Sequence, residues 1–118
     1  MNPDEQTQVL STRSSLKEIQ DYLHDRFIER GFSGQAASDK ILLLAEEVGE
    51  LAKAIRLADY NGPIDYQKLD HYGSVKEESA DVFIVLMSIC DYFGFSLIEA
   101  LIEKEKINRT RIWQKRSI

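Results

Sequence analysis

The chain has 118 residues, 43% of them hydrophobic, so it is long enough to form one folded domain with its own core. Its 15 basic and 20 acidic residues give a net charge of -5, which argues against a dedicated nucleic-acid-binding protein. The single cysteine, Cys90, excludes an internal disulfide and predicts a reducing compartment.

The N-terminal segment, residues 1–13, is polar and lacks the apolar run of a secretory signal. We expect a flexible tail there, followed by one domain over residues 14–118. The longest apolar run, residues 82–90, is short of the ~20 residues that span a bilayer. We therefore expect a cytoplasmic protein that contacts no membrane.

The first two helices are indicated by their end signals. Ser15 and Glu18 form a capping box, and Gly31 is a natural stop. A second helix is predicted to begin within residues 35–39 and to end near Asp59. Its apolar residues recur at steps of three and four and are expected to face the core: Ile41, Leu44, Val48, Leu51, Ile55 and Ala58.

The second half of the chain repeats this pattern after a connection over residues 60–73, which is either a lid over a ligand or an ordinary loop. Ser74 begins a third helix that ends at Gly94, and Ser96 begins a fourth that runs to about Trp113. The third helix is expected to have a core stripe of Val82, Leu86, Ile89 and Phe93. Four helices and no strand pattern predict an all-α, four-helix bundle-like protomer with antiparallel neighbours.

Two acidic pairs carry the candidate chemistry. Glu47 and Glu50 share one face of the second helix, at the edge of its apolar stripe, and Glu78 and Asp81 share one face of the third. If these helices pack side by side, the four carboxylates converge and repel one another unless a cation lies among them. Carboxylates without His or Cys nearby suit Mg²⁺, so these four residues are the candidate metal ligands. Capping by anionic side chains at a helix start accounts for part of the pattern near Glu78.

Other residues would complete a site for phosphoanhydride hydrolysis, in which a metal neutralises charge on phosphoryl oxygens. Glu46, beside the cluster, is a candidate general base for the attacking water and equally a plain surface charge. Lys104, Asn108 and Arg111 line one face of the last helix and are candidates for binding phosphates, with a solvated basic face as the alternative. The chain contains no Glu-x-x-His pair, glycine-rich phosphate loop or cysteine cluster.

These motifs resemble a known family. Residues 44–55 (LAEEVGELAKAI), residues 77–82 (EESADV), and Lys104 with Asn108 and Arg111 are similar to the MazG-like nucleotide pyrophosphohydrolases of the all-α NTP pyrophosphatase superfamily. The resemblance covers residues 16–113. It implies Mg²⁺-dependent cleavage of a nucleoside triphosphate to the monophosphate and pyrophosphate, with Mn²⁺ able to substitute.

The resemblance also implies residue roles and an assembly. It implies that the metal ligands are Glu47, Glu50, Glu78 and Asp81, and that Glu46 assists the attacking water. It also implies that phosphate or sugar is contacted by Lys104, Asn108 and Arg111. It implies a homodimer, or a homotetramer built from dimers, in which helices of two chains enclose the site. Only Phe27 and Phe32 correspond to the family's base-contacting aromatic residues, so no base preference is inferred.

Three interpretations of function follow. The leading one is an enzyme that removes noncanonical or surplus nucleoside triphosphates. The second is a relative that acts on dUTP or dCTP, or on phosphoribosyl-ATP, with the same metal chemistry and a different pocket. The third is a helical dimerisation module without catalysis, whose acidic pairs are surface and capping residues.

Overall fold

The computed structural model describes residues 9–59 and 73–115, and these residues form helices and connections without any strand. The predicted all-α class with four helices is therefore confirmed. In chain order the helices are α2 (Leu16–Glu29), α3 (Ala37–Asp59), α4 (Val75–Phe93) and α5 (Leu97–Asn108). The predicted connection over residues 60–73 and the predicted tail over residues 1–13 lie largely outside this description, so the lid and the domain limits stay predictions.

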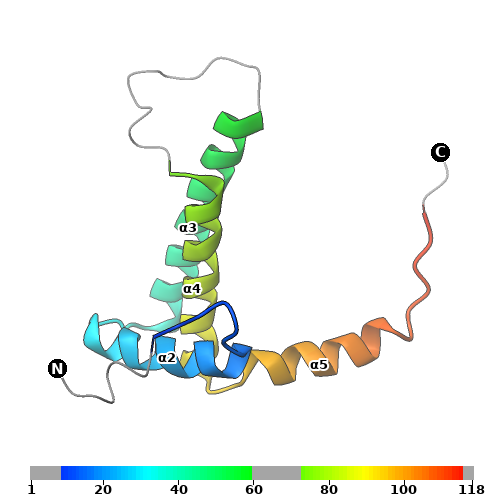
Figure 1. The fold of residues 1–118 in the computed structure, drawn as a ribbon, viewed down its shortest axis with the longest axis horizontal. Coiled ribbons are helices and arrows are strands. Elements are labelled where there is room, and N and C mark those ends of the chain that lie inside the picture. The colour runs from blue at the N-terminus through cyan, green and yellow to red at the C-terminus, as the bar shows by residue number, and fades with distance from the viewer. Residues whose placement is uncertain (1–8, 60–72, 116–118) are drawn as a thin grey trace.

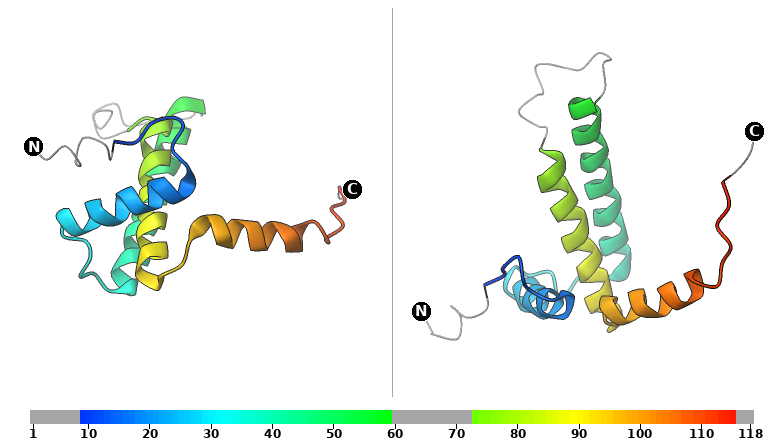
Figure 2. Two further views of the ribbon diagram at one scale, coloured as in Figure 1. Left: turned by 60° about the horizontal axis from the view of Figure 1, so that its bottom comes forward. Right: turned by 45° about the vertical axis from the view of Figure 1, so that its right-hand side comes forward.

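The helices are arranged around α4. The two long helices, α3 and α4, lie side by side and run antiparallel, as predicted (Figure 1). The shorter α2 crosses the C-terminal part of α4 and also contacts the beginning of α5. From there α5 leads away from the α3–α4 pair, so the four helices of one chain do not close around a common axis (Figure 2). Three helices, α2, α3 and α4, thus pack together, and α5 projects away from them.

Local signals determine most helix ends. Ser15 and Glu18 form the complete predicted capping box, and Ser74 and Ser96 each accept a hydrogen bond from a backbone amide three residues later. Gly31 and Gly94 have φ values of 82° and 70°, which glycine adopts without strain. Gly94 is the C-cap of α4, and Gly31 follows Arg30, the C-cap of α2. These ends lie where the sequence predicted them.

The end of α5 differs from its prediction. The helix stops at Asn108, five residues before Trp113. Two side chains form hydrogen bonds with backbone carbonyl oxygens there. The Thr110 hydroxyl donates to Ile107 O at 2.6 Å, and the Trp113 indole N–H donates to Asn108 O at 3.3 Å. Such bonds offer the backbone an alternative to helix continuation.

The described core lies where α2 crosses α4. Leu23, Phe27 and Met87 are buried against one another, with Leu97 of α5 at the edge of the cluster. Cys90 is also fully buried and packs as a small apolar residue. Burial of these side chains holds α2 across α4 and fixes the base of α5.

The apolar stripe of α3 was expected to face the core, and this prediction is wrong for most of the stripe: in a single chain four of its six residues are exposed and two are half-buried. Ile41, Val48 and Ile55 are 56%, 49% and 47% exposed, whereas Lys40 and Ala54 are buried. The face turned toward α4 is thus rotated by roughly 100° from the predicted one, a one-residue step around the helix. Periodicity identifies an apolar face but does not say whether the surface that covers it belongs to the same chain.

The predicted core stripe of α4 is also displaced. Phe93 and Leu86 are exposed and Val82 and Ile89 are half-buried, while the buried side chains of this helix are Val85, Met87, Ser88 and Cys90. Because residues 82–90 are nearly all apolar, the sequence offered several faces of similar hydrophobicity.

The membrane prediction rests on the length and apolarity of the helices. Within residues 9–59 and 73–115, no single helix is long and apolar enough to cross a membrane. Only α4 and α5 taken together reach the required length and composition, and they are bent by 95° relative to each other.

Candidate functional site: a carboxylate cluster between α3 and α4

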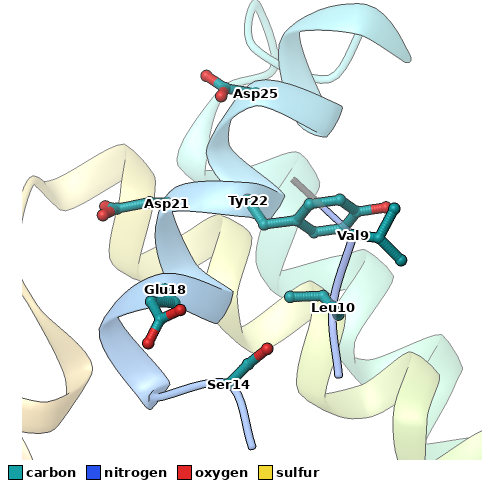
Figure 3. Close-up of a pocket in the computed structure, with 7 residues that line it drawn as sticks. All are labelled: Val9, Leu10, Ser14, Glu18, Asp21, Tyr22 and Asp25. Carbon is teal, nitrogen blue, oxygen red and sulfur yellow. The ribbon is translucent and has the colours of Figure 1, made fainter. Parts of the chain in front are cut away.

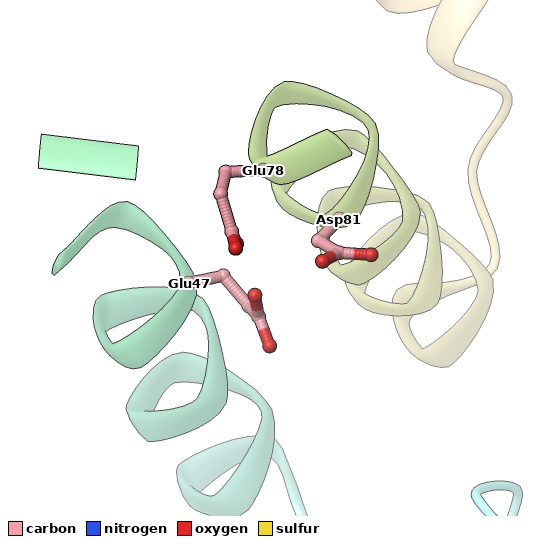
Figure 4. A group of neighbouring side chains, drawn as sticks. All are labelled: Glu47, Glu78 and Asp81. Atoms are coloured by element: carbon pink, nitrogen blue, oxygen red, sulfur yellow. The ribbon is translucent and has the colours of Figure 1, made fainter. Parts of the chain in front are cut away.

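Three carboxylates meet in the groove between α3 and α4. Glu47 comes from the middle of α3, and Glu78 and Asp81 come from the first two turns of α4. One carboxylate oxygen from each lies within 4.8 Å of the others, and Figure 4 shows the three side chains pointing toward one another. Three of the four carboxylates that were predicted to converge therefore do so within one chain.

The electrostatics of this cluster are unfavourable for three bare anions. The pKa of Glu47 is raised above its ordinary value by partial burial, and then by the charges of Asp81, Glu78, Glu50 and Glu46. The pKa of Glu78 is raised by desolvation, and then by Asp81, Glu50 and Glu77. A divalent cation among these oxygens would reverse the repulsion, and an all-oxygen ligand set fits Mg²⁺.

Glu50, the fourth predicted ligand, lies one helical turn beyond Glu47. It contributes to the raised pKa of both Glu47 and Glu78, so its charge is close to the cluster. Its carboxylate is also 3.5 Å from the ammonium group of Lys53. Glu50 borders the described cluster, and metal ligation by any of the four residues stays a prediction.

Glu46 does not join the cluster. It is exposed and lies 100° around α3 from Glu47, as consecutive helical residues do. It lines a wide hollow of about 700 Å³ together with Phe32, Gln35 and Leu42. Its predicted role as a general base stays a prediction, since nothing in the single chain directs it at the carboxylates.

The predicted substrate-binding residues of α5 are separated from the cluster. α5 begins at the end of α4 opposite to Glu78 and Asp81, about 18 Å further along the axis for the 12 residues from Asp81 to Phe93. Asn108 donates to Glu105 at 3.0 Å, and Lys104 and Arg111 have no side-chain partner among the described residues. One chain does not bring its own basic face to its own carboxylates (Figure 1).

An apolar pocket adjoins the carboxylates, and the sequence analysis did not identify it as a whole. It has a volume of about 220 Å³ and opens beside Glu47 and Asp81. The remaining lining residues come from α2, α3, α4 and the α2–α3 connection: Phe27, Phe32, Gln35, Leu43, Ile84, Val85 and Ser88.

A sequence signal for this pocket existed. Leu43 lies four residues before Glu47, and Ile84 and Val85 lie three and four residues after Asp81, so all three share a helix face with a carboxylate. Phe27 and Phe32, noted as possible base-contacting residues, are both in the lining. The pocket thus offers an apolar surface next to a polar one.

Gly73 precedes Ser74, the N-cap of α4, and lies close to the Glu78 side chain. A Cβ atom at this position would overlap the carboxylate of Glu78. A side chain there would therefore displace Glu78 from its position opposite Glu47. The residue before the helix cap is fitted to the carboxylate site.

A second pocket of about 230 Å³ lies between α2 and the segment that precedes it, and it contains Glu18, Asp21 and Asp25 (Figure 3). Its first two carboxylates have local partners: Glu18 accepts from the Ser15 amide, and Asp21 pairs with Lys17 at 3.0 Å. Helix capping and a surface ion pair therefore explain these two residues.

Comparison with known proteins adds a structural relative. No protein-family model and no curated protein matches the sequence. The fold is similar to that of a Bacillus subtilis protein, whose crystal structure is described as that of "the putative pyrophosphatase YPJD", with a TM-score of 0.70 and 27% sequence identity. The match covers 86% of this chain and 100% of the other. The chain therefore shares its helical fold, over nearly its full length, with a protein described as a pyrophosphatase.

Proposed function

We propose that the chain is a Mg²⁺-dependent nucleoside triphosphate pyrophosphohydrolase that cleaves (d)NTP to (d)NMP and pyrophosphate. The observation that carries this proposal is the carboxylate cluster, whose oxygens lie within 4.8 Å of one another, beside an apolar pocket lined by two phenylalanines. The structural similarity to a protein described as a pyrophosphatase supports the same reaction class. A MazG-like enzyme that removes noncanonical or surplus nucleotides is the form that we favour.

The two halves of the site suit the two halves of a nucleotide. A pocket of about 220 Å³ is smaller than the ≈300–1,000 Å³ of sites for drug-sized ligands, so it fits one base and leaves the polyphosphate outside. The polyphosphate would extend over Glu47, Glu78 and Asp81, with Glu50 at the margin. Bound Mg²⁺ would supply neutralisation of the charge on the phosphoryl oxygens.

We further propose that the working form is a homodimer or a homotetramer. Ile41, Val48 and Ile55 form an exposed apolar stripe on α3, and no residue of α5 is buried. A second copy that covers the stripe would bury this surface, and its α5 would bring Lys104, Asn108 and Arg111 to the acidic cluster. Opposite charge on the two surfaces favours that placement.

The test is a panel of ordinary and noncanonical (d)NTPs, with dUTP, dCTP and phosphoribosyl-ATP included, incubated with Mg²⁺ and assayed for pyrophosphate. Glu47→Gln and Asp81→Asn keep the side-chain shape and remove a charge. Each is expected to lower kcat/KM by about 100-fold or more, as loss of a charge-stabilising group does elsewhere. Glu77→Gln, in the same helical turn as Glu78, is the matched control and should retain activity.

The outcomes separate the interpretations. Release of pyrophosphate that depends on Glu47 and Asp81 supports the enzyme, and the preferred nucleotide distinguishes the house-cleaning form from the dUTP, dCTP and phosphoribosyl-ATP forms. Full activity in both variants would remove the proposed site. A chain that turns over no nucleotide, and whose melting temperature Mg²⁺ does not change, would instead be a non-catalytic dimerisation module.

A further inference from the structure

The connection between α4 and α5 is a tight elbow that determines where α5 points. Only Gly94, Phe95 and Ser96 separate the helices, which are bent by 95°. The elbow is closed from within by the Gly94 amide, which donates to Asp91 O at 3.2 Å, and by the Phe95 amide, which donates to Cys90 O at 3.1 Å. These bonds end α4 but do not hold α5 in any direction.

Gln20 of α2 binds both sides of this elbow with one side chain. Its amide nitrogen donates to Phe95 O at 2.8 Å, and its amide oxygen accepts from the Leu97 backbone N–H at 3.0 Å. Leu97 is the first residue of α5, so its N–H is one of the donors that have no partner within the helix. Gln20 therefore acts as a cap supplied from 77 residues away in the chain.

His24 holds the other side of the elbow from one turn further along α2. Its Nδ1 forms a hydrogen-bonded ion pair with the carboxylate of Asp91. Asp91 lies in the last turn of α4, where a negative charge opposes the helix dipole and no basic residue of α4 is present. When protonated, His24 supplies a compensating positive charge, and its hydrogen bond to Asp91 raises the pKa of His24.

Nothing else among the described residues fixes the far part of α5. Leu97 contacts the core, but the helix contains no buried residue. Asn108 lies about 16 Å along the axis from Leu97, so a tilt of roughly 20° at the elbow would move it by about 5 Å. A displacement of that size exceeds a hydrogen bond, which requires donor and acceptor within ~3 Å.

We propose that Gln20 and His24 are positioning residues, which set the direction of α5 and thereby the place where Lys104, Asn108 and Arg111 meet the substrate. The second half of this statement rests on the proposed function. The first half concerns the structure alone and can be tested without any substrate.

The structural test uses Trp113, the only tryptophan, as a fluorescence donor beyond the end of α5. An acceptor dye is attached to a cysteine introduced at the exposed Ser38 in α3. Cys90 is fully buried and its burial raises the pKa of the thiol, which leaves the introduced cysteine as the reactive one. Labelled chains are diluted into an excess of unlabelled Trp113→Phe chains, so that energy transfer occurs within one chain.

We expect one narrow donor–acceptor distance in the parent protein and a broad distribution in Gln20→Leu, which loses both hydrogen bonds. Gln20→Glu keeps the acceptor for Leu97 and should be intermediate, and His24→Gln should also broaden the distribution. Arg30→Leu, at an exposed position just past α2, is the control and should resemble the parent. Unchanged transfer in Gln20→Leu and His24→Gln would overturn the proposal, and Gln20→Glu serves if Gln20→Leu does not fold.

The kinetic test separates positioning from general destabilisation. In folded Gln20→Leu we expect KM to rise about tenfold with kcat changed less than about twofold, as loss of one or two hydrogen bonds predicts. If the parent is active and Gln20→Leu alters the energy transfer but not KM, the proposed link between the direction of α5 and substrate binding is overturned. If the parent protein turns over no nucleotide and Gln20→Leu still alters the energy transfer, the proposed function is overturned and the positioning of α5 by Gln20 is supported.

Discussion

The two long faces of α3 are used in opposite ways. The face toward α4 carries Glu47 and the buried Lys40 and Ala54, and it contributes a carboxylate to the cluster. The face turned away carries Ile41, Val48 and Ile55, all about half exposed. The helix thus carries apolar side chains on both faces, half-buried leucines beside the carboxylate on the inward face and exposed β-branched residues on the outward one, whereas an ordinary amphipathic helix has a single apolar face.

The outward face gives the largest expected effect. Val48→Asp combined with Ile55→Asp would place two charges in the proposed contact with a second copy. We expect the dissociation constant of the oligomer to rise by about 100-fold or more, because each apolar side chain contributes about 1.5–3 kcal/mol when buried. Analytical ultracentrifugation measures the change, with Ser38→Asp as the control. A parent protein that is monomeric at all concentrations would contradict the role given to this face.

The inward face should respond to metal rather than to association. At a Mg²⁺ concentration of 100 times Kd, the parent protein should gain about 2.7 kcal/mol of stability. Glu47→Gln should lose most of this gain, yet it should be more stable than the parent by up to about 1 kcal/mol without metal, because one repelling charge is absent. Thermal unfolding with EDTA and with Mg²⁺ gives both values. Equal Mg²⁺ effects in the parent and the variant would remove Glu47 from the metal site.

The pH dependence tests the same repulsion. Since the pKa of Glu47 is raised in the folded state, the folded protein holds this proton more tightly than the unfolded chain does. The resulting stability is present below the ordinary value of 4.5 and is lost as the pH rises through the raised pKa. Without metal, Glu47→Gln should therefore match the parent at low pH and exceed it at neutral pH, as measured by urea unfolding. A constant difference across this range would contradict the raised pKa.

Gly49, an exposed residue of α3, gives the smallest expected effect. A Cβ atom at this position in α3 would meet nothing within 4 Å. Gly49→Ala should therefore stabilise the helix by up to about 1 kcal/mol. Gly34→Ala also meets nothing within 4 Å but lies outside the helices, so it should lack this gain. Destabilisation of the oligomer by Gly49→Ala would show that a second copy approaches the backbone there.

The features that were predictable from the sequence are those with local causes. Ser15, Ser74 and Gly94 act within one helical turn, so the ends of α2 and α4 follow from the sequence. The spacing of Glu78 and Asp81 places both on one face of α4, and their meeting with Glu47 needs only that α3 and α4 pack together.

The features that were not predictable depend on which surfaces meet. The rotation of α3 was missed because its buried positions are Lys40 and Ala54 and not its most apolar residues. The elbow contacts of Gln20 and His24 join residues 67 to 77 positions apart, and a lone Gln or His in a helix gives no signal of such a partner. The pocket beside the cluster collects residues from three helices and a connection, so no single motif contains it.

The cap at Ser96 has a consequence for how an assembly would form. Its hydroxyl accepts from the Glu99 amide, and Gln20 accepts from Leu97, so α5 has satisfied donors at its beginning before anything covers its sides. An arm that is already shaped loses little conformational entropy when another molecule docks on it. α5 would then bind as a helix that is already formed, so little of the interaction free energy would be lost to ordering it.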